Sequence, residues 1–295
     1  MSCYSARIME AWTVRRIVAW MQADFERRGI DNARLDADLL VAEALGVKRI
    51  VLFMDPERPL IEAELTKVRA LVERRRAHEP IAYILGEREF YGRPFTVTRD
   101  VLIPRPDTET LVEAASEFLK QGAPLGRVLD LCTGSGAIAV SLAAERLERA
   151  LVASDLSPAA LAIAQQNAER HGVLERVELR QGDLFDVLGP DERFACVTIN
   201  PPYIAASELA TLQADVRDFE PRMALDAGSD ALSFYRRIAL AVGAHLEAGA
   251  GVFVEVGFGQ AADVRALFEA QGFTGVHALR DLAGIERVVR AVQPG

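Results

Sequence analysis

The stretch Val128-Leu129-Asp130-Leu131-Cys132-Thr133-Gly134-Ser135-Gly136 decides the fold of this chain. It begins as a short apolar strand and continues as a glycine-rich turn, and the residues from Ala137 onward predict a helix. Glycines in such a turn let the backbone approach a ligand closely, and the amino end of the helix favours negative charge. The glycine spacing differs from the usual dinucleotide-binding motif. The stretch therefore predicts a strand–turn–helix unit that holds a ligand at its turn.

The alternation of strands and helices continues through the rest of the chain. Further strands are predicted at residues 151–155, 177–179, 195–199 and 252–256, with helices at 158–171 and near 230–246 and 260–270. Two final strand candidates, near 276–279 and 287–291, are joined by a turn through Gly284, and we expect them to pair antiparallel at an edge. This order predicts an α/β, Rossmann-like fold with a mostly parallel seven-stranded sheet and helices on both faces.

Two acidic residues follow the second and third predicted strands. Asp155 closes the second strand, where a carboxylate can accept hydrogen bonds from both hydroxyls of a ribose. Asp183, followed by Leu184, comes after the third strand and is expected beside an adenine ring. Because open α/β sheets bind ligands at the carboxyl ends of their strands, the turn and both acids indicate a nucleoside site. Nicotinamide enzymes share such a turn and acid, so the fourth strand must decide the chemistry.

The fourth strand leads directly into Asn200-Pro201-Pro202-Tyr203. A pair of prolines is often a plain turn, but this pair follows a strand that faces the predicted ligand crevice. The prolines have no N–H, so this backbone presents mainly carbonyl acceptors. An incoming primary amide could donate its two N–H groups to the Asn200 side-chain oxygen and to a proline carbonyl, beside the flat Tyr203 ring. Such acceptors stabilise the positive charge that develops when an amide nitrogen attacks a methyl group.

The region before the sheet divides into two parts. Residues 11–78 have apolar residues at helical spacing and predict a small helical domain, in which Arg74-Arg75-Arg76 faces solvent. Residues 79–106 are punctuated by prolines and glycines, and their β-prone pieces, such as residues 81–85 and 95–97, predict a hairpin-like linker. The predicted domains are therefore 1–78, a linker at 79–106, and 107–295.

Composition limits the classes of partner and site. A net charge of −9 argues against a protein that mainly binds nucleic acid. Cys3, Cys132 and Cys196 have neither zinc-site nor redox spacing, and we expect reduced thiols in the cytoplasm. The start of the chain carries Glu10 and does not resemble a signal peptide. We expect no membrane span, because the sequence has no run of about 18 apolar residues. No metal site is expected, and the scattered histidines are interpreted as structural or surface residues.

The linker carries a resemblance to a known family. Residues 79–86 (Glu-Pro-Ile-Ala-Tyr-Ile-Leu-Gly), 89–92 (Glu-Phe-Tyr-Gly) and 102–109 (Leu-Ile-Pro-Arg-Pro-Asp-Thr-Glu) strongly resemble PrmC/HemK, and the similarity covers nearly the whole chain. That family methylates the glutamine of the Gly-Gly-Gln motif in peptide-chain release factors. The resemblance implies a class I methyltransferase fold, S-adenosylmethionine as cofactor, and release factors as protein partners, gripped by both domains. We expect a monomer.

The resemblance also assigns residues to roles. It places Asn200, Pro201, Pro202 and Tyr203 at the target glutamine, where they are the candidate catalytic and substrate-binding residues. The candidate cofactor-binding residues are Cys132, Thr133, Gly134, Ser135, Gly136, Asp155, Asp183, Leu184 and Asn200, joined by analogy by Phe90 and Arg105. The family often has glycine in place of Cys132, which we interpret as structural. Residues 205–230 are interpreted as a loop that closes over the substrate.

Two other hypotheses stay open from the sequence. Enzymes that methylate the exocyclic amine of adenine in DNA share the Asn-Pro-Pro-Tyr motif, but they need a positively charged DNA surface and base flipping. A non-catalytic module that docks release factors without turnover is the other hypothesis, although the motifs of this chain are intact.

Overall fold

The computed structural model describes residues 11–145 and 149–295. The chain divides into two compact units, Met1–Leu85 and Gly86–Gly295. Cys3 and Glu10 lie outside the described residues. None of the described helices is long and apolar enough to cross a membrane.

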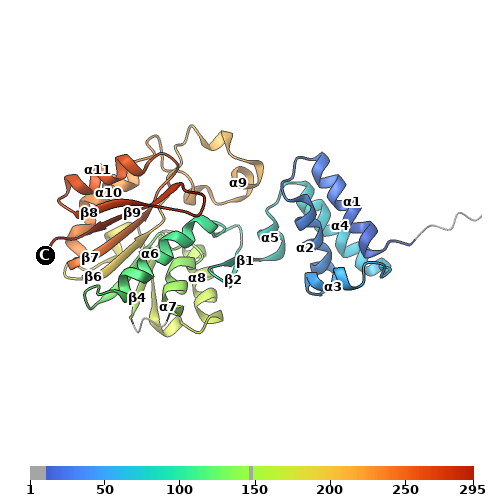
Figure 1. The fold of residues 1–295 in the computed structure, drawn as a ribbon, viewed down its shortest axis with the longest axis horizontal. Coiled ribbons are helices and arrows are strands. Elements are labelled where there is room, and N and C mark those ends of the chain that lie inside the picture. Colours follow the sequence, from blue (N-terminus) through green and yellow to red (C-terminus); the bar gives the residue numbers. More distant parts are fainter. Residues whose placement is uncertain (1–10, 146–148) are drawn as a thin grey trace, which may run out of the picture. The chain divides into compact units, whose positions relative to one another are not determined.

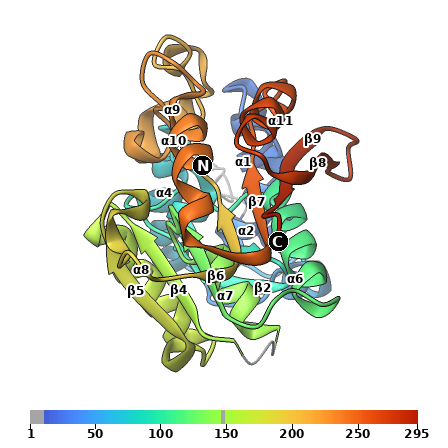
Figure 2. The same ribbon diagram turned by 90° about the vertical axis from the view of Figure 1, so that its left-hand side faces the viewer.

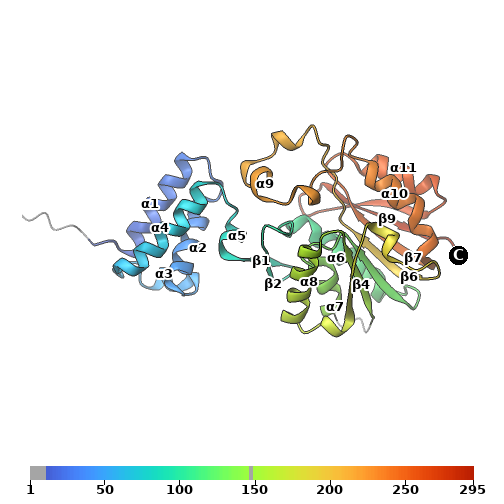
Figure 3. The ribbon, with the colours of Figure 1, turned by 180° about the vertical axis from the view of Figure 1, so that it is seen from behind.

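The first unit is helical, as predicted (Figures 1 and 3). Its helices are α1 (Val14–Arg27), α2 (Ala33–Leu45), α3 (Arg49–Met54), α4 (Glu62–Arg76) and α5 (Ile81–Leu85). α2 packs against α1, α3 and α4, and the apolar stripe of α1 supplies Met21 and Phe25 to the core. The β-prone interpretation of residues 81–85 is wrong, because they form α5. Ile84 is buried in the helical core, so tertiary packing overrides the local propensity.

The arginine run at the end of α4 is a solvated face only in part, because Arg74 is exposed as predicted but Arg75 is buried and Arg76 is half-buried. Arg75 is buried, and its Nε lies 2.7 Å from Asp36 Oδ2 on α2. Arg76 pairs with Asp24 on α1 at 2.8 Å, and Arg74 forms two bonds with Glu79. Because buried charges must be paired, these arginines tie α4 to its neighbours.

The second unit is built on a sheet that, within the described residues, has seven strands in the order β5-β4-β3-β6-β7-β9-β8 (Figure 1). The strands are β3 (Arg127–Leu131), β4 (Leu151–Asp155), β5 (Val177–Gln181), β6 (Phe194–Ile199), β7 (Leu246–Glu255), β8 (Thr274–Arg280) and β9 (Glu286–Val292). β3 to β7 pair in parallel, whereas β9 is antiparallel to both β7 and β8. The predicted fold class and the antiparallel edge are confirmed.

Helices cover both faces of this sheet (Figure 2). α6 (Glu109–Lys120), α7 (Ala137–Ala144) and α8 (Pro158–Arg170) pack on one face, and α10 (Ser233–Val242) and α11 (Ala261–Ala270) on the other. Alternate strand residues supply the two cores. Leu129 and Leu131 of β3 join one core and Val128 joins the other.

Two further segments precede and follow the central strands. β1 (Glu87–Phe90) and β2 (Arg93–Thr96) form the hairpin that the linker sequence predicts. Residues 205–230 contain α9 (Ala214–Phe219) and short 3-10 turns, and a bridge between Ile204 and Asp226 closes the base of this segment.

β3 and β6 are neighbours in the sheet, but the strands that follow them in the chain lie on opposite sides: β4 and β5 beyond β3, and β7 beyond β6. The strand order therefore reverses between β3 and β6. Ligands of open α/β sheets bind at such a reversal, outside the carboxyl ends of the strands. The topology therefore places the candidate site where the glycine-rich turn and the Asn-Pro-Pro-Tyr motif leave the sheet.

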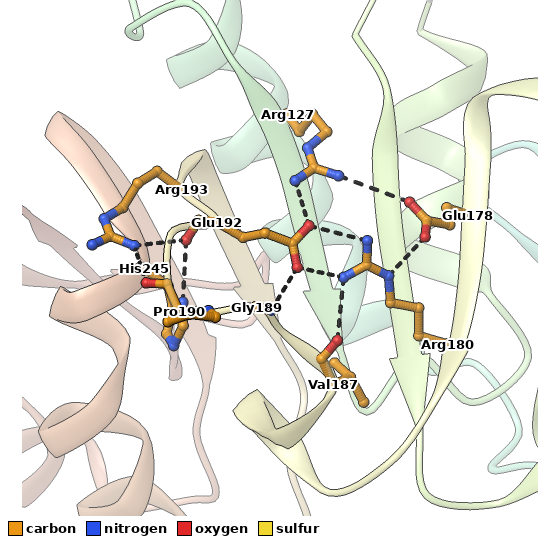
Figure 4. Close-up of polar contacts among 9 residues, drawn as sticks. All are labelled: Arg127, Glu178, Arg180, Val187, Gly189, Pro190, Glu192, Arg193 and His245. Atoms are coloured by element: carbon orange, nitrogen blue, oxygen red, sulfur yellow. Dashed lines mark hydrogen bonds and ion pairs between the residues drawn. The ribbon is translucent and has the colours of Figure 1, made fainter.

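A cluster of ion pairs joins β3, β5 and the segment before β6 (Figure 4). Glu192 accepts hydrogen bonds from Arg127, from both terminal nitrogens of Arg180 and from the Gly189 N–H, at 2.6 to 3.0 Å. The arginines hold the pKa of the Glu192 carboxyl well below its usual range.

Candidate active site

A cavity of about 330 Å³ opens at the carboxyl ends of β3, β4, β5 and β6. Its volume lies at the lower end of the roughly 300–1,000 Å³ typical of small-molecule sites. The lining includes most of the predicted cofactor residues, namely Arg105, Cys132, Thr133, Gly134, Ser135, Asp155, Asp183, Leu184 and Asn200, and also Pro202. Residues that lie far apart in the sequence are therefore gathered at one concave site.

The glycine-rich turn is held in place by Asp130, a residue without an assigned role in the sequence prediction. Its carboxyl is buried and accepts hydrogen bonds from Thr133 Oγ1 at 2.6 Å and from Thr198 Oγ1 on β6 at 2.8 Å. Burial raises the pKa of Asp130 to about 7. Asp130 therefore couples the turn after β3 to the strand that carries Asn200.

Two positions of the turn show how its backbone is shaped. Gly136 has a φ of +78°, and a Cβ there would lie 3.1 Å from the Cβ of Ala164 on α8. Gly136 does not line the cavity, so it allows the close approach of α8 and does not contact the ligand site directly. Cys132 also has a positive φ, +59°, and burial raises the pKa of its thiol, which is thereby a poor nucleophile.

Asp155 ends β4 at the wall of the cavity. Its Oδ2 accepts the Gly134 N–H and its Oδ1 accepts the Ser157 N–H, each at 2.9 Å. A carboxylate has about four lone-pair sites, so acceptor capacity is left for hydroxyl groups of a ligand. Burial raises the pKa of Asp155, although the backbone donors oppose this. The geometry fits the predicted role at a ribose.

Asp183 and Leu184 lie at the end of the cavity that β5 forms. Leu184 is buried with a φ of +47°, and Asp183 Oδ2 lies 2.6 Å from Arg237 Nη2 on α10. Arg237 and Phe234 of the same helix also line the cavity. This part of the wall combines an ion pair with apolar side chains, as a site for a heteroaromatic ring requires.

The Asn-Pro-Pro-Tyr segment leaves β6 at the cavity. Asn200 lines it and donates from Nδ2 toward Thr108 Oγ1 at 3.5 Å, and the buried Glu255 carboxyl lies beside this pair. Pro202 lines the cavity, whereas Pro201 is buried and Tyr203 lies outside the lining. Burial raises the pKa of the Tyr203 phenol to about 12.

Gln260 holds this segment from behind. Its Nε2 donates to the Tyr203 carbonyl at 3.0 Å, and its Oε1 accepts from the Gly257 N–H and from the Tyr235 hydroxyl. The backbone of the motif is therefore fixed by a side chain that follows β7, the strand next to β6.

The run Arg105 to Glu109 supplies a different contact at almost every position. Arg105 pairs with the buried Glu220 at 2.6 Å, Asp107 with Arg287 at 2.9 Å, and Glu109 accepts the Tyr91 N–H at 2.9 Å. Thr108 is buried beside Asn200 and Glu255. Arg105 lines the cavity, as predicted.

Phe90 is not where the sequence prediction placed it. Its side chain is 1% exposed and packs edge-on against Phe95, with ring centroids 5.9 Å apart, and it is absent from the cavity lining. Phe90 is an apolar core residue of the hairpin, so the prediction that it lines the cofactor pocket is corrected.

Several contributors to the site were missed by the sequence interpretation. They are Asp130, Thr108, Glu220, Arg237, Glu255 and Gln260. Asp130 and Thr108 lie inside motifs that the sequence displays, and could have been found there. The other four contact partners more than 50 residues away in the chain, as Arg237 contacts Asp183. The local sequence around these four residues does not indicate such distant contacts.

In residues 11–145 and 149–295, no group of three or more His, Cys, Asp or Glu side chains is arranged to hold a metal ion. His171 contacts the Pro94 carbonyl and His245 stacks on Phe185, so both are structural.

Comparisons with known families match both parts of the chain. Residues 16–86 match the family described as the PrmC N-terminal domain, and residues 128–219 match a methyltransferase domain. The chain is 45% identical over 280 residues to a release factor glutamine methyltransferase of Geobacter sulfurreducens, covering 95% of this chain and 96% of the relative. It is 46% identical over 255 residues to a protein of the same name from Bordetella pertussis, covering 86% and 93% of the two chains.

A likeness to solved structures concerns the fold. The hMettl16 catalytic domain in complex with the MAT2A 3'UTR hairpin 1 has a TM-score of 0.56 and 15% sequence identity, over 81% of this chain and 86% of that chain. At this identity, the match shows a shared methyltransferase fold and nothing about the substrate.

Proposed function

Since this chain belongs to the family of the release factor glutamine methyltransferases, we propose that it transfers a methyl group from S-adenosylmethionine to the side-chain amide nitrogen of a glutamine in a release factor. The target is the glutamine of the Gly-Gly-Gln motif. The observation that carries the proposal is the position of Asn200, which lies in the wall of the cavity with its Nδ2 turned toward Thr108. This orientation leaves Oδ1 as the acceptor for an incoming amide N–H.

The residues of the cavity fit the cofactor. The Asp155 carboxylate is poised to accept hydrogen bonds from ribose hydroxyls, and Asp183 with Leu184 forms a place for the adenine ring. The backbone of Cys132 to Ser135 borders the same space. When bound, S-adenosylmethionine supplies an electrophilic methyl group.

The chain's own groups prepare the amide nitrogen. Asn200 Oδ1 and a carbonyl of the proline pair accept the two N–H groups of the glutamine, which fixes the nitrogen and directs its lone pair toward the cofactor. Acceptors at both N–H groups stabilise the positive charge that develops on nitrogen during attack. The Tyr203 ring, which lies outside the cavity lining, is proposed to flank the carboxamide plane. An N-methylated amide cation is acidic enough to lose its proton without a strong base.

The remaining parts of the chain serve recognition. In this proposal residues 1–78 and 107–295 together grip the release factor, and 79–106 link them. Residues 205–230 close over the substrate, which is supported by Pro221, Met223 and Ala224 in the cavity lining. The protein acts in the cytoplasm as a monomer and does not bind nucleic acid directly.

A labelling experiment tests the function. The purified protein is incubated with methyl-labelled S-adenosylmethionine and a release factor, and the labelled residue is located by mass spectrometry. We expect label on the glutamine of the Gly-Gly-Gln motif. Undiminished labelling of a release factor in which that glutamine is alanine would contradict the assignment. Methylation of bare duplex DNA would favour the adenine-methylating class instead.

A further inference from the structure

Glu255 places a carboxyl group behind the Asn200 side chain. It is the last residue of β7, which pairs in parallel with the strand that leads into Asn200. Glu255 is 3% exposed, and because Val254 pairs with Ile199 in the sheet, its side chain lies next to that of Asn200, with Thr108 close by. Its Oε2 has no hydrogen-bond partner among the described residues. A carboxyl so deeply buried with an unpartnered oxygen is costly, and the proposed methyl transfer does not use it directly.

Other charged and titratable groups face Glu255 from each neighbouring element. They are Asp107 from the turn before α6, Arg287 from β9, Tyr203 from the Asn-Pro-Pro-Tyr segment and Tyr235 from α10. Arg287 is already engaged by Asp107 and Asp281, at 2.9 and 3.1 Å. Because Arg287 is held by these two carboxylates, the groups left to donate a hydrogen bond to Glu255 are the neutral side chains of Asn200 and Thr108.

The chemistry of the contact has a direction. A carboxamide has a donor end and an acceptor end, and turning it by 180° exchanges them at almost no steric cost. An ionised carboxylate only accepts hydrogen bonds, so it holds the NH₂ end of Asn200 toward itself. The acceptor end must then face away from Glu255. A protonated carboxyl can also donate, and it no longer distinguishes the two orientations.

We propose that Glu255 is a positioning residue that fixes the orientation of the Asn200 carboxamide, so that Oδ1 faces the substrate amide. This inference rests on the proposed function for its consequence in catalysis, but the contact itself can be tested without turnover. Glu255 need not touch the substrate, because it acts through Asn200.

The proposal makes the site sensitive to pH in a defined direction. Burial is the main reason that the pKa of Glu255 rises, to about 7. Above that pH the carboxylate holds Asn200 in the productive orientation, and below it the preference is lost. Activity should therefore fall as the pH drops through about 7.

The sequence offers a direct spectroscopic test, because the chain has only three asparagines, Asn32, Asn167 and Asn200. In protein labelled with ¹⁵N on asparagine, the side-chain amide of Asn200 is assigned by its loss in Asn200→Ala. We expect this signal to move between pH 5.5 and 8.5 with a midpoint at about pH 7, and to stop moving in Glu255→Gln.

Two internal controls accompany this experiment. The Asn167 amide donates to the Ser135 and Thr96 carbonyls, so an unchanged Asn167 signal shows that the variant is folded. Asp130→Asn removes the other carboxyl with a pKa of about 7 and should leave the titration of Asn200 in place. An Asn200 signal that does not titrate, or that titrates equally in Glu255→Gln, would overturn the proposal.

Kinetics with a release factor measure the consequence. Glu255→Gln should lower kcat about tenfold or more, which is the usual effect of one charge-assisted hydrogen bond, while the Kd of S-adenosylmethionine is unchanged. It should also flatten the pH profile below pH 8. Glu247→Gln makes the same change at the other end of β7 and should behave as the parent. If Glu255→Gln has the kcat and the pH profile of the parent, the positioning role is refuted. If the parent protein does not methylate a release factor at all, the proposed function is refuted, and the spectroscopic test alone decides whether Glu255 orients Asn200.

Discussion

Glu192→Gln should destabilise the second unit, because one carboxylate holds together segments from three parts of the chain (Figure 4). Glu192 accepts three hydrogen bonds from Arg127 and Arg180 and one from the Gly189 N–H. Its side chain is 23% exposed, so solvent weakens these contacts without removing them. A bond to a charged group contributes roughly 1.5–3 kcal/mol when buried and an exposed ion pair about 0–1 kcal/mol.

The expected loss in the free energy of unfolding is therefore about 1–2 kcal/mol, since glutamine keeps one acceptor oxygen but turns a donor toward an arginine. For a unit of this size the Tm should fall by about 3–6 °C, which scanning calorimetry measures. Glu178→Gln is the matched control, because Glu178 pairs with the same arginines but is 55% exposed. Its Tm should change by less than about 2 °C.

The pH dependence of this effect has a fixed sign. The arginines lower the folded-state pKa of Glu192 from its ordinary value of 4.5, so its contribution is present above pH 4.5 and is lost as the pH falls further. The difference in Tm between parent and Glu192→Gln should shrink between about pH 5 and pH 3. Equal effects of the Glu192 and Glu178 variants, or a difference in Tm that persists at low pH, would refute the reasoning.

Three further predictions concern two residues of the cavity wall and the glycine-rich turn beside it. Asn200→Ala should reduce the methylation rate at least about a hundredfold, as loss of a transition-state acceptor does, while calorimetric titration finds S-adenosylmethionine binding within about threefold of the parent. Asp155→Ala should raise the Kd of the cofactor at least about tenfold through lost ribose hydrogen bonds, with a smaller effect on the KM of the release factor. Gly136→Ala should lower the free energy of unfolding by about 2–4 kcal/mol, because a positive φ and a clash with Ala164 combine. Gly134→Ala is the control, since a Cβ there meets nothing within 4 Å and should cost only about 1–2 kcal/mol. Denaturant unfolding measures both.

The sequence predicted the sheet because the signals of a Rossmann-like fold are local. Each strand is a short apolar run, and the glycine-rich turn and the strand-end acids directly follow such runs. The same local logic located Asp155, Asp183 and Asn200 in one cavity, since parallel strands end at one edge. The antiparallel edge was predicted from the turn through Gly284, whereas the strand order was not predicted and is seen only in the structure.

The wrong predictions have one physical cause, which is that burial depends on distant partners. The residues of α5 have β-prone side chains, yet Ile84 packs into a helical core. Arg75 looks like part of a solvated run until Asp36, 39 residues away, is placed 2.7 Å from it. Phe90 belongs to a motif shared with a methyltransferase family, but its ring packs on Phe95 and not on the cavity. Sequence periodicity does not contain these pairings.

The Arg105 to Glu109 run shows why a motif can be recognised without its function being understood. As a string it is a family signature, but in the fold it is a junction between separate elements. Arg105 engages Glu220 of the segment after the proline pair, Asp107 engages Arg287 of β9, and Thr108 joins the side chains of Asn200 and Glu255. Because a positioned acceptor must be held to well under an ångström to assist methyl transfer, a substitution in this run should alter the orientation of Asn200 before it alters the cavity. The run is therefore better understood as the support of the amide-binding acceptor than as a part of the cofactor site, with Thr108 as the residue that contacts Asn200 and also lines the cavity.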